Sequence, residues 1–140
     1  MVLADGLILD LEDAVGPSLK ETARENVRLT FSTSSISFAP SVVAVRMNGL
    51  DTRWGKEDLK EICRTKADAV VVPKVESPDT VRSVARLMQE FQAHDDMKIW
   101  AMVETPKGIL NVANIAESDK RLCALVMGTS DLSRVSFFHT

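Results

Sequence analysis

Short runs of apolar residues recur along the chain and alternate with segments in which apolar residues follow a helical period. Each run is almost continuously apolar, which is typical of parallel strands that are covered on both faces. The runs begin roughly 25 to 35 residues apart, which is the length of one strand–helix–strand unit. They predict five strands, at residues 7–11, 42–47, 69–72, 99–103 and 122–127.

The segments between these runs predict four helices. The clearest start is Ser77-Pro78-Asp79, which supplies an N-cap residue, a first-turn proline and a negative charge in the first turn. Pro17 likewise suits the first turn of the first helix. The expected helices include residues 17–27, 55–63, 77–91 and about 108–117, and the polar, serine-rich residues 32–41 are expected to form a surface loop.

This alternation predicts an α/β protein with a parallel sheet. Two architectures fit the pattern. A doubly wound sheet of five strands would be complete at this length. A (β/α)8 barrel takes about 250 residues, so five strands in 140 residues would form a little more than half of one. No linker-like segment divides the chain, which predicts a single domain over residues 1–140.

Composition and charge narrow the class of protein. Apolar residues make up 45% of the chain and charged residues 26%, as in average soluble domains. The net charge of −3 gives no basic footprint for nucleic acid or for a membrane surface, and no apolar run approaches the roughly 20 residues of a membrane span. Cys63 and Cys123 have no metal or redox spacing. We therefore expect them to be small core residues in a reducing compartment, the cytoplasm or, in a eukaryote, the mitochondrial matrix.

Every predicted strand delivers a charged group at its end. The carboxyl ends of parallel strands meet at one edge of the sheet, so these groups are expected to lie close together. Carboxylates that face one another repel unless a cation lies between them, and oxygen ligands suit Mg²⁺. A guanidinium suits a substrate carboxylate or an enolate oxygen. The groups are Asp10, Glu12 and Asp13 after the first strand, Arg46 at the second, Lys74 and Glu76 after the third, Glu104 after the fourth and Asp131 after the fifth.

The acidic groups and Arg46 also have ordinary structural explanations. Glu104 could be one partner of a salt bridge, and Asp131 could cap a helix that follows it. Arg46 could form an ion pair with Asp10 or Glu12. One of the three carboxylates after the first strand could cap the turn.

The remaining polar candidates are weaker. Lys74 is more often a solvated strand end than a catalytic amine. His94 lies near the end of a predicted helix and His139 in the C-terminal tail, so neither position suits a general base.

Five segments resemble the citrate lyase beta-subunit family, which also contains malyl-CoA and citramalyl-CoA lyases and belongs to the HpcH/HpaI aldolase/citrate lyase superfamily. The segments lie at the predicted strands, in the family's order, and together cover nearly all of residues 4–133. They are ADGLILDLEDAV at 4–15, VRMN at 45–48 with DT and WG behind it, VPKVES at 72–77, MVET at 102–105 and VMGTSDL at 126–132.

The resemblance implies a partial TIM-type (β/α)8 barrel with about five of its eight strands. It implies that Glu104 and Asp131 ligate Mg²⁺, and that Arg46 is a catalytic residue that binds the substrate and stabilises an enolate. Glu12 and Asp13 would surround the waters of the metal. The residues whose amides would bind a substrate carboxylate are Gly128, Thr129 and Ser130.

The implied reaction is the reversible Claisen-type cleavage of a hydroxyacyl-CoA, such as citryl-, malyl- or citramalyl-CoA, to a keto acid and an acyl-CoA. The implied partners are these small molecules, with neither nucleic acid nor membrane. A homo-oligomer is expected for the full-length protein.

Departures from the family pattern bear on activity. Ser130 stands where many members carry a second acidic residue. The family's first strand, with an active-site arginine, and its last strands, with an acid/base aspartate, have no counterpart, and residues 134–140 form an atypical tail. These departures predict a truncated form that lacks part of the catalytic machinery. Two alternatives stay open: a Mg²⁺-dependent aldolase that acts on free 4-hydroxy-2-keto acids, and a non-catalytic truncated product or subunit.

Overall fold

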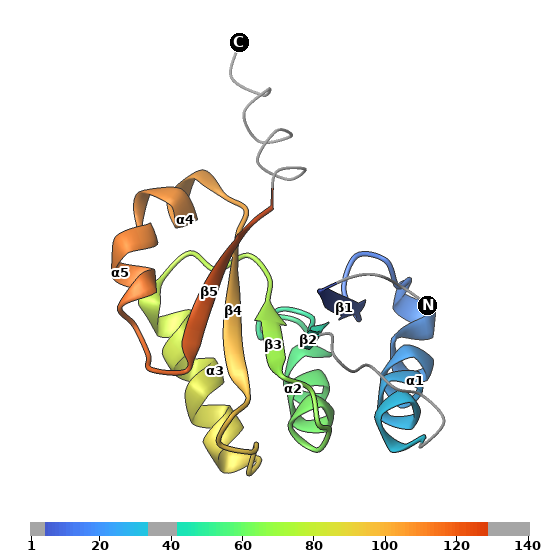
Figure 1. Cartoon of the computed structure of the whole chain (residues 1–140). Coiled ribbons are helices and arrows are strands. Elements are labelled where there is room, and N and C mark those ends of the chain that lie inside the picture. The colour runs from blue at the N-terminus through green and yellow to red at the C-terminus, as the bar shows by residue number, and fades with distance from the viewer. Residues whose placement is uncertain (1–4, 34–41, 129–140) are drawn as a thin grey trace.

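The computed structural model describes residues 5–33 and 42–128. Strands and helices alternate as the apolar pattern predicts (Figure 1). The strands are β1 (Gly6–Asp10), β2 (Val42–Arg46), β3 (Ala69–Val72), β4 (Lys98–Val103) and β5 (Leu122–Met127). The helices are the 3-10 turn η1 (Pro17–Leu19), α1 (Lys20–Ser32), α2 (Gly55–Cys63), α3 (Pro78–Glu90), α4 (Pro106–Leu110) and α5 (Val112–Ala116).

The five strands form one parallel sheet in which neighbours follow the order of the chain, from β1 to β5. Figure 1 shows β1 at one side of the sheet and β5 at the other. A doubly wound sheet reverses its strand order part-way, because its second half is built outward from the first strand. The uninterrupted order is that of a barrel wall. The prediction of a partial TIM-type barrel is therefore confirmed, and the doubly wound alternative is wrong.

The two faces of the sheet are covered differently. The main core lies between the sheet and the helices, where α1, α2, α3 and α5 pack against alternate strand residues such as Val45, Val70 and Ile99. Helices on one face and a second apolar layer on the other are typical of a barrel wall whose inner face points to the barrel axis. The inner-face cluster consists of Ala44, Ala69 and Val71, with Trp100 and Met102 packed against them.

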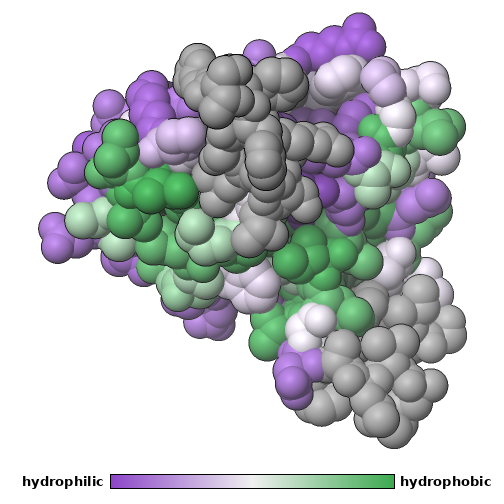
Figure 2. Space-filling model, turned by 90° about the horizontal axis from the view of Figure 1, so that it is seen from above, coloured by the Kyte–Doolittle hydropathy of each residue, from purple (hydrophilic) through white to green (hydrophobic). Residues whose placement is uncertain are grey.

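Large apolar side chains are exposed mainly on the edge strands and on α4. Seen from above, hydrophobic surface lies between hydrophilic regions (Figure 2). The least covered parts of the described sheet are thus β1, β5 and the start of β2. The exposed side chains on strands are those of Ile8, Val42, Leu125 and Met127, and those on α4 are Ile109 and Leu110.

Two local predictions are corrected by the structure. The helix expected over about residues 108–117 begins at Pro106 and is divided at Asn111, whose backbone leaves the helical conformation (φ −100°, ψ 3°). The Asn111 side chain donates to the carbonyl of Glu76 at 3.0 Å, which explains the interruption. Ser77 occupies the predicted N-cap position of α3, but its side chain makes no capping hydrogen bond.

The two cysteines also differ from each other. Cys63 is buried, as predicted, but Cys123 is exposed, so its prediction as a core residue is wrong. Ile99 pairs with Leu122, whereas the next residue of β4 pairs with Ala124. Cys123 is therefore the extra residue of a bulge and has no partner on β4. Exposed and partly buried residues alternate along the edge strand β5, and Cys123 lies on the exposed side together with Leu125 and Met127.

Some predictions fall on residues 34–41 and 129–140, which lie outside the described residues. They are most of the polar loop at 32–41 and the whole atypical tail at 134–140. Within the described ranges no helix has both the length and the apolar character to cross a membrane.

Candidate active site

The segment after β1 carries three carboxylates, and Asp10 organises it. Asp10 Oδ1 accepts a hydrogen bond from the amide of Glu12 at 2.8 Å, and Oδ2 accepts one from the amide of Ala14 at 3.0 Å. This confirms the prediction that one of the three carboxylates caps the turn. The turn places Glu12 in a buried position and leaves Asp13 exposed.

Arg46 at the end of β2 lies beside Asp10, because the two residues are paired in the sheet. Its Nε donates to Asp10 Oδ1 at 2.7 Å and its Nη2 to Oδ2 at 2.6 Å, which makes a bidentate pair. Nη1 lies 3.0 Å from Glu12 Oε2 and 3.7 Å from Asp13 Oδ2. The ion pair expected with Asp10 or Glu12 is therefore formed with both. Contact of Arg46 with a substrate stays a prediction.

This pair shifts the acidity of both partners. Burial would raise the pKa of Asp10, but hydrogen bonds from Arg46 and from the amides of Glu12 and Ala14 lower that pKa below its ordinary value. The hydrogen bond to Asp10 raises the pKa of Arg46. Both groups stay charged at neutral pH, so the sheet edge holds a fixed positive charge among carboxylates.

Lys74 approaches the same carboxylates from the turn after β3. Its Nζ donates to Glu12 Oε1 at 2.6 Å, although about half (51%) of the lysine side chain is exposed. This hydrogen bond raises the pKa of Lys74. Lys74 is thus an ion-paired residue at the strand end. Glu12 Oε2 is buried and has no hydrogen-bond partner among the described residues, because its approach to Arg46 is an ion contact only.

Glu104 directly follows β4 and is buried, with 3% of its surface exposed. Its Oε1 accepts the main-chain N–H of Lys74 at 3.0 Å. Gly128 lies against it at the end of β5. A Cβ placed on Gly128 would come within 2.5 Å of Glu104 Cγ and 2.8 Å of Oε2. A glycine at this position therefore leaves room for the Glu104 carboxylate.

The described part of the site fits one half of a Mg²⁺ site. The carboxylates of Glu104 and Glu12 are hard oxygen donors, and Mg²⁺ takes only one or two protein carboxylates besides water and substrate oxygens. Within residues 5–33 and 42–128, no three His, Cys, Asp or Glu side chains converge to hold a metal by themselves. The remaining predicted site residues, Thr129, Ser130 and Asp131, lie outside the described residues.

A cleft of about 750 Å³ opens beside this cluster. Glu12 and Lys74 line it, together with Glu76 and Thr105 from the turns after β3 and β4. Glu76 is paired with Lys107 at 3.1 Å, and the hydrogen bonds from Lys107 and Thr105 lower the pKa of Glu76. The cleft is large enough for a small organic acid next to the carboxylates.

A buried polar network beneath the site was not predicted from the sequence. Lys20 Nζ donates to the carbonyls of Leu11 and Glu12, each at 2.7 Å. Asn48 Nδ2 donates to the carbonyl of Leu11 at 2.9 Å and to Asp58 Oδ2 at 2.6 Å. These bonds hold the turn that carries Glu12. One signal could have revealed the network: Asp58 stands among the apolar residues of the α2 stripe, four positions before Ile62.

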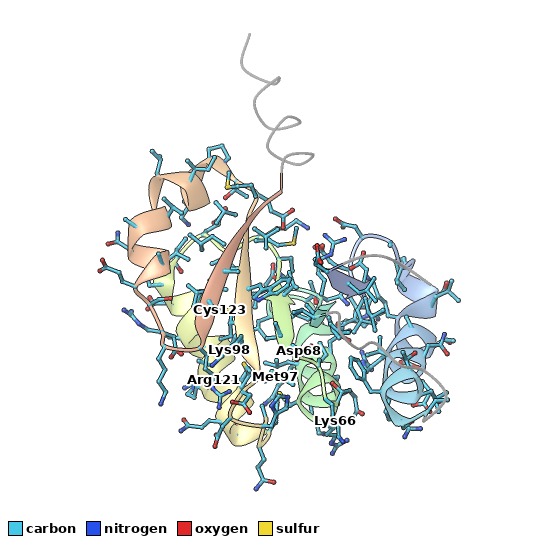
Figure 3. The ribbon with its side chains drawn as sticks, in the orientation of Figure 1. Lys66, Asp68, Met97, Lys98, Arg121 and Cys123 are labelled. Carbon is cyan, nitrogen blue, oxygen red and sulfur yellow. The ribbon has the colours of Figure 1, made fainter. Side chains whose placement is uncertain are left out.

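The opposite edge of the sheet uses its polar groups differently. Figure 3 shows Lys66, Asp68, Met97, Lys98 and Arg121 near the N-terminal ends of β3, β4 and β5. Arg121 Nη1 donates to the carbonyl of Met97 at 2.9 Å, and Asp68 accepts from the amide of Val43 at 2.8 Å. These bonds tie side chains to the main chain, which is typical of the stabilising end of a barrel.

His94 belongs to this opposite edge as well. Its Nε2 lies 3.0 Å from the carbonyl of Ala67, in a hollow of about 870 Å³ between the ends of α2 and α3. The hollow is larger than the cleft beside Glu12, but it lies at the opposite edge of the sheet from the strand-end carboxylates. The prediction that His94 is no general base at the site is consistent with this placement, and His139 lies outside the described residues.

The amino-acid sequence of the chain, including the charged strand ends, matches a known protein family. The family model HpcH/HpaI aldolase/citrate lyase matches residues 1–136. The chain belongs to this family. Membership of the HpcH/HpaI aldolase/citrate lyase family confirms the resemblance that the strand-end motifs carry.

Individual members of the HpcH/HpaI aldolase/citrate lyase family include enzymes of two kinds. The chain is 42% identical over 131 residues to a (3S)-malyl-CoA thioesterase of Cereibacter sphaeroides, which covers 94% of the chain and 43% of that protein. It is 31% identical over 137 residues to the L-malyl-CoA/beta-methylmalyl-CoA lyase of Rhodobacter capsulatus, which covers 93% of the chain and 42% of that protein. The chain thus spans less than half the length of these relatives.

Solved structures of the family share the fold. RipC from Yersinia pestis is 32% identical and superposes with a TM-score of 0.77, over 94% of this chain and 55% of that one. The citrate lyase beta subunit of Mycobacterium tuberculosis, complexed with oxaloacetate and magnesium, is 29% identical with a TM-score of 0.73, over 95% of this chain and 52% of that one. The chain is therefore similar to about half of a family barrel.

Proposed function

We propose that the chain carries the metal site of a Mg²⁺-dependent carbon–carbon lyase. The reaction is the reversible Claisen-type cleavage of a hydroxyacyl-CoA of the malyl-, citramalyl- or citryl-CoA type to a keto acid and an acyl-CoA. One observation above all supports this proposal: the buried carboxylate of Glu104, held at the sheet edge by the Lys74 amide and facing Gly128. Buried carboxylates in proteins are paired with charges or coordinate metals, so a carboxylate in this position suits a metal ligand.

The residues that would hold the metal are Glu104 and Asp131. Asp131 follows Gly128 by three positions in the sequence, and a Cβ on Gly128 would meet the Glu104 carboxylate. Glu12 and Asp13 would accept hydrogen bonds from metal-bound waters. Bound Mg²⁺ would supply a Lewis acid that draws electron density from the oxygens of the keto acid.

Arg46 would serve as the catalytic cation of the chain itself. Asp10 occupies the Nε and Nη2 edge of the guanidinium and fixes its plane. The Nη1 side faces the Glu12 and Asp13 carboxylates, the groups proposed to surround the metal. There Arg46 would bind substrate oxygen and stabilise the negative charge that develops as the carbon–carbon bond breaks. The amides of Gly128, Thr129 and Ser130 would bind the substrate carboxylate.

A second candidate reaction is hydrolysis of the same thioester, and the 42% identity to a malyl-CoA thioesterase favours it. The two reactions break different bonds. The lyase breaks the bond between the carbinol carbon and the carbon next to the thioester, and it releases a keto acid while the thioester stays intact. The hydrolase adds water to the thioester carbonyl and releases free CoA thiol.

Products therefore distinguish the candidates. The chain with Mg²⁺ is incubated with malyl-CoA and with citramalyl-CoA, and keto acid is measured as its phenylhydrazone and thiol with Ellman's reagent. Keto acid without thiol supports the lyase, and thiol without keto acid supports the hydrolase. Turnover of free 4-hydroxy-2-keto acids alone would support the aldolase alternative instead. Mg²⁺ binding without any turnover would support a non-catalytic product or subunit.

The metal assignment is tested independently of turnover. Glu104→Ala and Asp131→Ala are each expected to abolish Mg²⁺ binding in calorimetric titration while the circular dichroism spectrum is retained. Asp95→Ala, whose side chain is fully exposed beside Arg121 at the opposite edge of the sheet, serves as a control and should bind Mg²⁺ like the wild type. Unchanged titration in both site variants would remove the metal assignment.

The substrate partners are therefore an acyl-CoA and a keto acid. We also propose that the full-length protein assembles into a homo-oligomer. Its proposed compartment is the cytoplasm or a mitochondrial matrix.

A further inference from the structure

Lys74 has a backbone conformation that side-chain-bearing residues rarely adopt. Its φ is 50°, in the left-handed region. Among the described residues, the only other non-glycine with positive φ is Gln92, at 59°. Such a conformation persists where surrounding contacts fix it, and it recurs at functional sites. The contacts that fix Lys74 therefore indicate what its conformation is for.

The main-chain hydrogen bonds around Lys74 show what its amide does. Pro73 has no N–H to donate. The amide of Val75 donates to the carbonyl of Met102 at 2.9 Å, which is an ordinary main-chain link to β4. Between these two residues, the amide of Lys74 donates to a side chain, Glu104 Oε1, at 3.0 Å. The residue with the left-handed conformation is thus also the one whose N–H points to the carboxylate.

The side chain of Lys74 anchors the same turn from the other direction. Its Nζ lies 2.6 Å from Glu12 Oε1, on the segment after β1. Glu12 is itself fixed, since Lys20 holds the carbonyls of Leu11 and Glu12. Lys74 therefore joins two carboxylates that arrive from strands far apart in the sheet, one through its ammonium and one through its amide.

We propose that Lys74 is a positioning residue for the metal ligand Glu104, and that it acts through its main-chain N–H in the left-handed conformation. The bond to Oε1 limits rotation of the carboxylate and orients it for the ion. Hydrogen-bond partners of metal ligands commonly have this effect, and their loss weakens metal binding or activity by about 10- to 100-fold. This inference rests on the proposed Mg²⁺-dependent function.

The test separates the backbone of Lys74 from its ammonium. Lys74→Gly removes the ammonium but keeps the N–H and accepts positive φ readily. Lys74→Val also removes the ammonium, but its β-branched side chain opposes positive φ and shifts the amide. Gln92→Val imposes the same backbone conflict at φ 59°, in a residue that lies just after α3 and away from the site. It is the matched control for strain alone.

Metal binding is measured with Mg²⁺ by calorimetry and with Mn²⁺ by electron paramagnetic resonance, and folding by thermal unfolding. We expect Lys74→Val to lower the affinity for both ions by about tenfold or more and to change the Mn²⁺ spectrum. The affinity of Lys74→Gly for both ions should stay within about threefold of the wild type. Glycine would thus retain the binding that valine loses at the same position. Gln92→Val should lose thermal stability comparably to Lys74→Val but bind both ions as the wild type does.

The outcomes keep the two proposals apart. A wild-type chain that binds neither ion contradicts the proposed function, and the role of Lys74 falls with it. Wild-type binding that Lys74→Val leaves unchanged overturns the role of Lys74 and leaves the metal site standing. Equal loss in Lys74→Gly and Lys74→Val also overturns it, because the ammonium would then be the operative group. Equal loss in Gln92→Val would show that strain, and not the amide, weakens binding.

Discussion

Arg46 and Asp10 form a bidentate pair across neighbouring strands, with Nε to Oδ1 at 2.7 Å and Nη2 to Oδ2 at 2.6 Å. The same carboxylate accepts the amides of Glu12 and Ala14, so it binds both the guanidinium and the turn that carries Glu12. Asp10 thereby sets the position of the two groups that flank the proposed metal site. Its removal is expected to affect the fold and the site together.

Asp10→Asn should lower the free energy of unfolding by about 2 kcal/mol, because hydrogen bonds to charged partners are stronger than neutral ones. Urea denaturation followed by circular dichroism measures the change. Asp13→Asn is the matched control, since Asp13 is 60% exposed and lies 3.7 Å from the same arginine. It should cost less than about 0.5 kcal/mol. Equal losses in the two variants would contradict the special role of Asp10.

The lowered pKa of Asp10 makes stability depend on pH in a stated direction. A carboxyl whose pKa is lower in the folded state stabilises that state above its ordinary pKa and loses this contribution as pH falls through the folded value. The chain should therefore lose stability in acid, below about pH 4. Urea midpoints measured between about pH 5 and pH 2 should fall less steeply in Asp10→Asn. Parallel profiles for the variant and the wild type would contradict the assignment.

Gly128→Ala should disturb Glu104 directly. The added methyl group would lie 2.5 Å from Glu104 Cγ, and the buried glutamate must move to admit it. We expect Mg²⁺ affinity to fall by about tenfold and stability to fall by about 1 to 3 kcal/mol. Gly16→Ala, where a methyl group meets nothing within 4 Å, should change neither quantity. If Gly128→Ala titrates like the wild type, Glu104 moves without consequence for the metal.

Asp58→Ala should be among the more destabilising single substitutions in the described chain. Asp58 is fully buried and accepts from Arg24 Nε at 2.8 Å and from the amide and side chain of Asn48. Its loss leaves buried donors unsatisfied, which costs about 3 kcal/mol. The exposed pair of Arg82 with Asp79 provides the comparison, and Arg82→Ala should cost less than about 1 kcal/mol. Chemical denaturation of both variants measures the two losses in the free energy of unfolding, and equal losses would contradict the prediction.

The two thiols should react at very different rates. Burial raises the pKa of Cys63 to about 11, so almost no thiolate forms there near pH 8. Cys123 is exposed at the bulge of β5. Ellman's reagent should therefore modify one thiol quickly in the native chain and both only in denaturant. A Cys123→Ser variant that still reacts quickly without denaturant would contradict this assignment.

Much of the fold could be predicted because its determinants are local. Apolar runs such as 69–72 and the Ser77-Pro78-Asp79 helix start carry their structure in neighbouring residues, and both occur where the sequence places them. The predictions from sequence were wrong where residues distant in the sequence determine the local structure. Asn111 interrupts its helix because it reaches the carbonyl of Glu76. Cys123 is exposed because it lies on the uncovered side of the edge strand β5.

For the site, the sequence by itself determined which charged groups meet at one edge, because parallel strands that end in Asp10, Arg46 and Glu104 must end together. Only the tertiary structure decided the partners within that set. Asp10 takes Arg46 because β1 and β2 are paired in register. Glu104 takes the amide of Lys74 because β3 and β4 are paired in register, so the turn after β3 lies beside the end of β4. Hydrogen bonds depend on distances of tenths of an ångström and on direction, and these are set by packing and register across the sheet.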